Sequence, residues 1–209
     1  QDLTTWLKEK APKRRAFYED TWRDVCRTRF FHSLFALCDL SQDCIWPADR
    51  WREALQVWAE EGMVLRSWRY AAPLLQSMPD DVLQKVIHSV TWWLQEVSKS
   101  INRHESLLKN LCHRVLTLPL ETDQSSLVNR NDDETNDLVG SAINHPVGHV
   151  TQALINLWFK QNPNDSDLLP ADLEPIFTAL CGTEVEQFRP ARVIMGSRLI
   201  SFFRVDRLW

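Results

Sequence analysis

The stretch that decides the fold is residues 80–97, which read DDVLQKVIHSVTWWLQEV. Apolar residues return every three or four positions from Val82 to Val97, and the charged residues occupy the opposite face. This spacing is typical of an amphipathic α-helix. Asp80 directly follows Pro79 and is a suitable N-cap, so we expect a helix to begin at this point.

The same spacing recurs through most of the chain. It is visible over residues 13–38, 51–58, 65–77, 107–116, 147–158, 173–180 and 190–203, and the 209 residues include only five glycines. The sequence therefore predicts an all-α fold. Pairs of these helices span about 35 to 45 residues, and no sequence motif recurs at a fixed period. We therefore expect irregular stacked helical hairpins of the α-solenoid or helical-repeat type. A compact helical bundle is the alternative.

Three regions follow from this pattern. We expect an N-terminal helical array over residues 1–120, an acidic polar linker over 121–140 and a C-terminal three-helix unit over 141–209. In the last region, Asn144 is expected to cap a helix that starts at Pro146. The final helix is expected to run unbroken from Pro190 past Phe203, and its apolar circumference predicts the most buried element.

Composition limits the functional classes. Lys and Arg number 24 and Asp and Glu 28, and no apolar run approaches the about 20 residues that a membrane helix needs. The first residues lack the basic, apolar and small-residue order that is typical of a signal peptide. The five cysteines are an odd number without CxxC spacing, which favours reduced thiols over a disulfide framework. We therefore expect a cytoplasmic protein without a membrane partner.

Motifs for catalysis are weak. The dispersed glycines cannot form a phosphate-binding loop, and no GxSxG elbow occurs. His145 and His149 have a spacing compatible with a metal, but no third ligand is indicated. Cys112 and His113 are adjacent on a helix and point apart, so we expect a core thiol and a surface imidazole. We predict no catalytic, cofactor or metal site in this segment.

Nucleic-acid binding is an alternative function. Basic residues gather near aromatic ones at Lys13, Arg14, Arg15, Arg23, Arg27 and Arg29. Residues 1–70 nevertheless hold 12 basic and 11 acidic residues, a net charge of +1, so this pattern favours a salt-bridged helix face. The alternative is a stand-alone helical regulator that binds nucleic acid through this face, and we expect nucleic acid to be the less favoured partner.

Ten tryptophans are the unusual feature of the composition. Six fall within the first 70 residues at helical spacing, so we expect most of the ten to be core. Trp92 and Trp209 are the expected exceptions and, with Arg14 and Arg15, the candidate partner-binding residues. The chain begins at Gln1 and stops at Trp209 after an apolar run, which leads us to expect a piece of a longer protein.

The last 65 residues carry several short motifs. In order they are Asn144-His145-Pro146-Val147-Gly148, Ala153-Leu154, Leu157-Trp158-Phe159, Arg192-Val193-Ile194, Ser197-Arg198-Leu199, Phe203-Arg204-Val205-Asp206 and Trp209. This set resembles the helical C-terminal region of large prokaryotic anti-phage defence proteins whose N-terminal part is a sirtuin-like NAD-consuming domain. The resemblance assigns no functional residue. It implies that any NAD-consuming activity lies outside this segment.

These expectations combine into one hypothesis about function. The segment is expected to be a non-catalytic sensing, scaffolding or oligomerisation region of a larger antiviral protein. Its expected partners are other domains of the parent chain, a partner protein such as a phage protein, or a second copy. From the residues alone, we expect Gly148 to permit close helix approach and Arg192, Arg198 and Asp206 to form ion pairs between helices.

Overall fold

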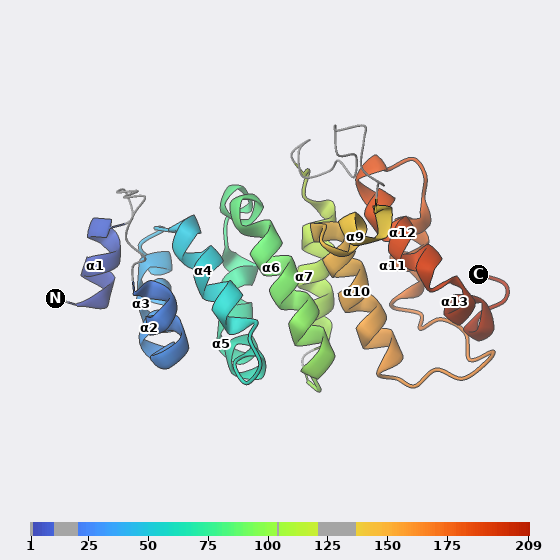
Figure 1. Cartoon of the computed structure of the whole chain (residues 1–209), viewed down its shortest axis with the longest axis horizontal. Coiled ribbons are helices and arrows are strands. Elements are labelled where there is room, and N and C mark those ends of the chain that lie inside the picture. The colour runs from blue at the N-terminus through green and yellow to red at the C-terminus, as the bar shows by residue number, and fades with distance from the viewer. Residues whose placement is uncertain (1, 11–20, 104, 121–136) are drawn as a thin grey trace. The chain divides into compact units, whose positions relative to one another are not determined.

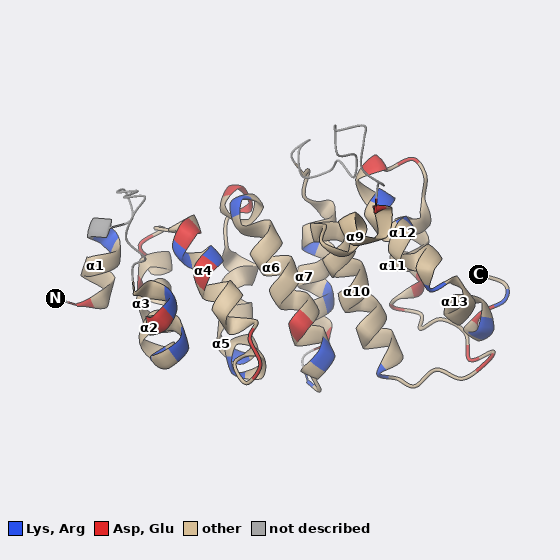
Figure 2. Cartoon of the chain, in the orientation of Figure 1, with Lys and Arg blue, Asp and Glu red and all other residues tan. Residues whose placement is uncertain are grey.

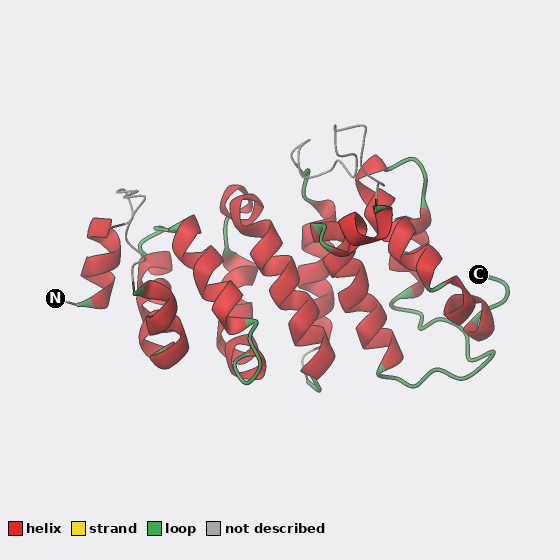
Figure 3. Cartoon of the chain, viewed as in Figure 1, coloured by secondary structure: helices red, strands yellow, loops and turns green. Residues whose placement is uncertain are grey.

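A computed structural model describes residues 2–10, 21–103, 105–120 and 137–209. Those residues form twelve α-helices and one short 3-10 helix. Loops join the helices, and no strand occurs within the described ranges (Figure 3). The predicted all-α fold is confirmed. The described residues fall into two compact units, Gln1–Ile101 and Asn102–Trp209, which are unit 1 and unit 2 below.

The described residues of unit 1 form six helices, coloured blue to green in Figure 1. They are α1 (Leu3–Lys10), α2 (Trp22–Thr28), α3 (Phe30–Gln42), α4 (Ala48–Trp58), α5 (Val64–Ser77) and α6 (Asp80–Ser100). Helix α4 packs on both α2 and α6, while α3 packs on α1 and α5. Because α2 also packs on α3, and α5 on α6, alternate helices form two layers, which is the arrangement of stacked hairpins.

Tryptophans fill the core of unit 1. Trp51 and Trp58 lie two turns apart on α4, are fully buried, and have ring centroids 6.3 Å apart. Trp22 donates a hydrogen bond from its indole to the Arg50 carbonyl at 3.0 Å. Trp93 of α6 donates to the Ser67 hydroxyl of α5 at 2.9 Å. The predicted helical spacing of these rings is confirmed, and it places large apolar groups between the two layers.

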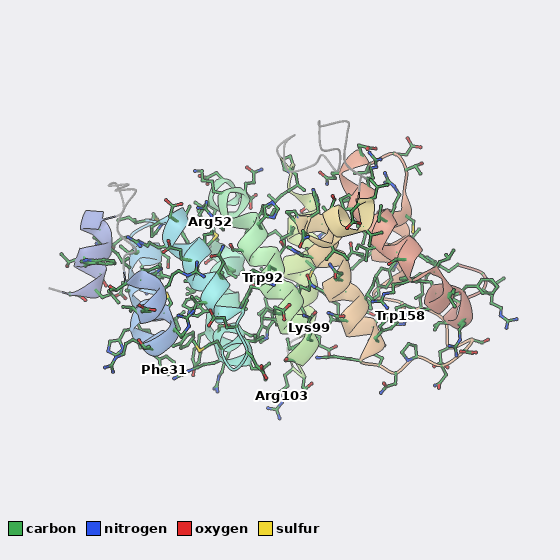
Figure 4. The ribbon with its side chains drawn as sticks, in the orientation of Figure 1. Phe31, Arg52, Trp92, Lys99, Arg103 and Trp158 are labelled. Atoms are coloured by element: carbon green, nitrogen blue, oxygen red, sulfur yellow. The ribbon has the colours of Figure 1, made fainter. Side chains whose placement is uncertain are left out.

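Unit 2 is built around one buried helix. Its elements are α7 (Glu105–Thr117), α9 (Leu138–Ile143), α10 (Pro146–Phe159), α11 (Glu174–Cys181), η1 (Glu186–Phe188), α12 (Arg189–Ser197) and α13 (Leu199–Val205). Helix α10 packs against α7, α9 and α12. Its Trp158, labelled in Figure 4, forms an aromatic cluster with Phe177 and Phe202 at centroid distances of 6.1 and 4.7 Å.

Packing divides the chain at a different place from the sequence-based boundaries. Helix α7 packs on α10 and belongs to unit 2, whereas the sequence grouped it with residues 1–120. Most of the expected linker, residues 121–136, lies outside the described residues. Its last part is helical: α9 begins at Leu138, and the Asp137 carboxylate accepts a hydrogen bond from the Gly140 amide at 2.8 Å. Asp137 is an N-cap, and Ala142 of α9 is buried, so this end is part of the fold.

The junction of α9 and α10 contains the first of the short motifs. His145, rather than the expected Asn144, is the N-cap of α10, and its Nδ1 accepts a hydrogen bond from the Val147 amide at 3.1 Å. Asn144 ends α9 instead. Pro146 begins α10 as predicted. A Cβ built on Gly148 would lie 1.7 Å from the Ala142 carbonyl oxygen, so the predicted close approach is confirmed and only glycine fits there.

Replacing Gly148 should therefore destabilise unit 2. We expect Gly148→Ala to lower the free energy of unfolding by at least about 2 kcal/mol, because α9 must move away from α10. The matched control is Gly196→Ala in α12, where an added Cβ meets nothing within 4 Å. The control should leave stability unchanged or raise it by up to about 1 kcal/mol. Urea unfolding followed by circular dichroism measures both, and equal stability of the two variants would contradict this packing.

Candidate interaction surface at the C-terminal helices

The last apolar segment is not one buried helix. It breaks at Arg198, where φ is −113° and ψ is 13°, and becomes α12 and α13. Gly196 and Ser197 precede the break, and both residues disfavour a helix interior. The Ser197 hydroxyl donates to the Ile194 carbonyl at 2.6 Å, which competes with the helical hydrogen bonds. The prediction of a single, most buried final helix is therefore wrong.

The break turns large apolar side chains toward solvent. Helix α13 buries Phe202 and Val205, and Phe202 lies edge to face with Phe177 at 5.2 Å. Three other apolar residues of the same helix are exposed: Leu199 by 63%, Ile200 by 78% and Phe203 by 59%. Only one face of α13 packs on unit 2. The remaining circumference is an apolar ridge.

The loop that follows α10 fixes α13 in this position. The amides of Ser166 and Leu168 donate to the carbonyls of Arg204 and Val205 at 3.0 and 3.1 Å. The Arg204 guanidinium also forms an ion pair with Asp165 at 2.7 Å. Leu168 has φ at 69°, a left-handed conformation that is strained for this residue, and it is 57% exposed. The loop therefore holds one more apolar side chain beside the ridge.

The C-terminal residues fold back onto the same surface. Asp206 accepts hydrogen bonds from the amides of Leu208 and Trp209, each at 3.2 Å, and from the Leu169 amide at 3.4 Å. The sequence predicts an ion pair for Asp206, but its carboxylate binds these backbone amides instead. The Trp209 ring stacks on Phe202 at 5.1 Å, and its indole donates to the Thr178 hydroxyl at 2.8 Å. Trp209 keeps 36% of its surface exposed.

Together these segments enclose a groove of about 910 Å³. Its walls include Leu168, Thr178, Cys181, Leu199, Phe203 and Trp209. We name this surface the α11–α13 groove; Ile200 extends it along the ridge of α13, and Leu208 is 96% exposed at its C-terminal end. Burial raises the pKa of the Cys181 thiol, although nearby Arg192 acts in the opposite direction.

The other expected partner residues lie elsewhere. Trp92 is 44% exposed near the middle of α6 in unit 1 (Figure 4), on a face that also carries Lys85, His88 and Lys99. Burial lowers the pKa of His88. This face is polar apart from the single indole. Trp92 and Trp209 thus belong to different units, and Arg14 and Arg15 lie outside the described residues.

Arg23 and Arg27, two of the basic residues near the N-terminus, contact neighbouring side chains. Arg27 forms ion pairs with Glu60 at 2.6 Å and with Asp24 at 3.5 Å, and the hydrogen bonds from Arg27 lower the pKa of Glu60. Arg23 donates to the Gln56 amide oxygen at 3.2 Å. Acidic and basic residues alternate along α2 and α4 (Figure 2). The predicted salt-bridged face is present at Arg27, which pairs with Asp24 of its own helix and with Glu60.

The residues of the two weak candidate pairs lie on α7 and at the start of α10. His145 is buried at the start of α10, and no group of three metal-binding side chains occurs in the residues that the structure describes. Cys112 is buried, which raises its pKa to about 12, and His113 is exposed, as predicted.

Arg192 donates to the carbonyls of Gly182 and Val185 at 2.7 and 3.0 Å and ties the loop before η1 to α12.

Comparisons with known proteins add no relative. No protein-family model, curated protein sequence or solved structure matches the chain. Within the described ranges, none of the helices combines the length and the apolar character required to cross a membrane.

Replacing Trp209 tests whether the C-terminus is part of the fold. We expect Trp209→Ala to lower the free energy of unfolding by about 1 to 2 kcal/mol, because the ring loses its stacking on Phe202 and its hydrogen bond to Thr178. The matched control is Leu208→Ala, which removes a side chain that is 96% exposed and should have little effect. Denaturant unfolding of both variants measures the difference, and a Trp209→Ala variant as stable as the control would show that the fold does not need this contact.

Proposed function

We propose that this chain is a non-catalytic helical scaffolding region of a larger, cytoplasmic prokaryotic antiviral defence protein, and that it pairs with a second copy through the α11–α13 groove. One observation carries the proposal. Five large apolar side chains line one hollow and expose between 36% and 96% of their area, namely Leu168, Leu199, Phe203, Leu208 and Trp209. A sixth, Ile200, is 78% exposed and extends this surface along the ridge of α13.

The size of this surface matches a protein interface. Because a large side chain presents on the order of 200 Å², these six expose roughly 800 Å² in total. Soluble monomers rarely expose a contiguous apolar patch above a few hundred Å². A standard interface takes about 800 Å² from each partner. The exposed apolar area of the groove and its ridge is therefore close to the area that one partner contributes to a standard interface.

A second copy is the partner that this shape favours. In a two-fold dimer the same patch must serve both subunits, so it must contain a projection as well as a hollow. Ile200 and Phe203 form a ridge directly beside the hollow that Thr178, Cys181 and Trp209 help to line. The ridge of one copy can enter the groove of the other. Both surfaces are apolar at their centre, as expected of an interface core.

The resemblance to anti-phage proteins supports the wider setting. All of the motifs that carry it lie in unit 2, and they form the α9–α10 junction, the aromatic cluster, the break at Arg198 and the C-terminal turn. In this proposal the task of such a region is to hold an oligomer together. The effector chemistry, including any NAD consumption, belongs to another part of the parent protein. The nucleic-acid alternative through residues 13–29 gains no support, because Arg23 and Arg27 already bind neighbouring side chains.

The oligomeric state tests the proposed pairing. Light scattering should report a dimer of about 49 kDa, twice the 24.5 kDa of the chain, at high protein concentration. Ile200→Glu combined with Phe203→Glu should give a folded monomer, because two buried carboxylates would each lack a partner in the interface. The matched control is Val185→Glu, which places the same charge on an apolar side chain that is 39% exposed outside the groove.

Three results would contradict the pairing. They are a wild-type monomer at all concentrations, a dimer that survives both groove substitutions, and a dimer that is lost in the Val185→Glu control. Circular dichroism confirms in each case that the variant is folded.

The intact mass of the natively expressed protein tests the larger setting. The proposal expects a mass well above 24.5 kDa, because the effector domain would be on the same chain. A native mass of 24.5 kDa would contradict the defence-protein part of the proposal and leave the dimer as a property of a small helical protein.

A further inference from the structure

A second surface of unusual composition lies in unit 1, on α3 and α5. Phe31 and Phe35 of α3 stack with centroids 5.9 Å apart and an interplanar angle of 23°. Tyr70 of α5 meets Phe31 edge to face at 5.4 Å. Phe35 is 60% exposed and Tyr70 37% exposed, and Phe31 is labelled at the lower edge of the unit in Figure 4. Together with Arg66 and Arg69, these rings form what we name the aromatic–arginine surface.

Both arginines of this surface lie over its rings. The Arg66 guanidinium carbon is 4.6 Å from the centroid of Phe31 and 5.0 Å from that of Phe30. The Arg69 guanidinium carbon is 5.5 Å from the centroid of Tyr70. Such stacking fixes the planar cation on an aromatic face and leaves its N–H groups available for an anion.

These two cations differ from most of their neighbours in lacking an acidic partner. Within unit 1, ion pairs to carboxylates occupy Lys8, Arg27, Arg50, Arg52, Lys85 and Lys99. Neither Arg66 nor Arg69 has a carboxylate within 4.0 Å among the residues that the structure describes. Helix α5 itself contains no acidic residue. Glu60, which precedes the helix, is bound to Arg27.

From this combination we infer that the aromatic–arginine surface binds single-stranded nucleic acid. Each nucleotide supplies a flat base and a negative phosphate, which are the two groups that this surface can receive. The bases would stack on Phe35 and Tyr70, and the phosphates would accept hydrogen bonds from Arg66 and Arg69. A duplex does not fit this arrangement, because its bases are already stacked on one another. The inference does not depend on the groove of unit 2.

An acidic peptide is the competing ligand, and the geometry favours the nucleic acid. Carboxylates would satisfy the two arginines but would leave the exposed Phe35 ring without a planar group to cover it. In a single strand, by contrast, a base accompanies every phosphate. With two phosphate contacts, the logarithm of the binding constant should fall with the logarithm of salt concentration at a slope of about −1.4. Binding should therefore be modest and about sevenfold weaker at 200 mM than at 50 mM salt.

Fluorescence anisotropy with the full chain tests the inference. The probes are labelled oligo-dT and oligo-U of ten nucleotides, titrated between 50 and 200 mM KCl. We expect both to bind with the stated slope. Arg66→Gln with Arg69→Gln should bring the slope close to zero. Phe35→Ser should weaken binding about fivefold or more while keeping the slope, because it removes a stacking platform and no charge.

The matched control is Arg23→Gln, which removes an arginine of α2 that donates to Gln56. It should bind like the wild type, and Ile200→Glu with Phe203→Glu should also leave binding unchanged. Circular dichroism verifies folding; because Phe35, Arg66 and Arg69 are all exposed, none of these variants removes a core side chain.

The inference would be overturned by any of three results. One is no binding of either oligonucleotide at 50 mM salt. Another is binding that does not depend on the proposed residues: it persists without Arg66 and Arg69, or it disappears in Arg23→Gln. Loss of binding in Arg23→Gln would place the site on the N-terminal face. The third is binding of a labelled tryptophan-containing oligoglutamate peptide, with the same dependence on Arg66 and Arg69, in place of the oligonucleotides. That result would identify an acidic protein segment as the ligand.

Discussion

The turn at Arg198 decides what unit 2 buries and what it presents. If α12 continued through this residue, Leu199, Ile200 and Phe203 would follow the helix onto a different surface, and the groove would not form. The break instead places Phe202 in the aromatic cluster with Trp158 and Phe177. Hydrogen bonds from the 162–169 loop and from the Asp206 turn then hold α13 from its far end. The same turn that buries the Phe202 ring therefore leaves Leu199, Ile200 and Phe203 exposed.

Helix identity was readable from the sequence because each long helix has its own polar face. The prediction for residues 80–97 corresponds to α6, Asp80–Ser100, and the expected close approach at Gly148 is present. The final segment, residues 190–203, carries apolar residues over most of its length, so its periodicity alone did not separate the buried residues from the exposed ones. An apolar circumference suits both a core helix and an interface helix. Gly196 and Ser197 are the signal for the break in the sequence, because both residues have low helix propensity.

The two surfaces were harder to predict than the helices because neither is local in sequence. Trp209 was correctly expected to be partly exposed, but its stacking on Phe202 and its bond to Thr178 depend on tertiary contacts. The groove joins residues 168–181 to residues 199–209. The aromatic–arginine surface joins Phe31 and Phe35 to residues about 35 positions away on α5. The pattern within any one helix contains only half of each surface. The basic residues near Arg27 are close together in the sequence and form a more visible pattern, but Arg27 itself is ion-paired.

Self-association through α13 is the central claim, and hydrogen exchange of the backbone amides tests it most directly. Exchange followed by mass spectrometry, at protein concentrations below and above the dimer midpoint, resolves the amides of residues 199–209 and of α11. We expect these amides to exchange more slowly at high protein concentration, while the exchange rates of the amides of α3 and α5 stay the same. Equal exchange of residues 199–209 at both concentrations, in samples that light scattering shows to be monomer and dimer, would contradict the claim and place the dimer contact elsewhere.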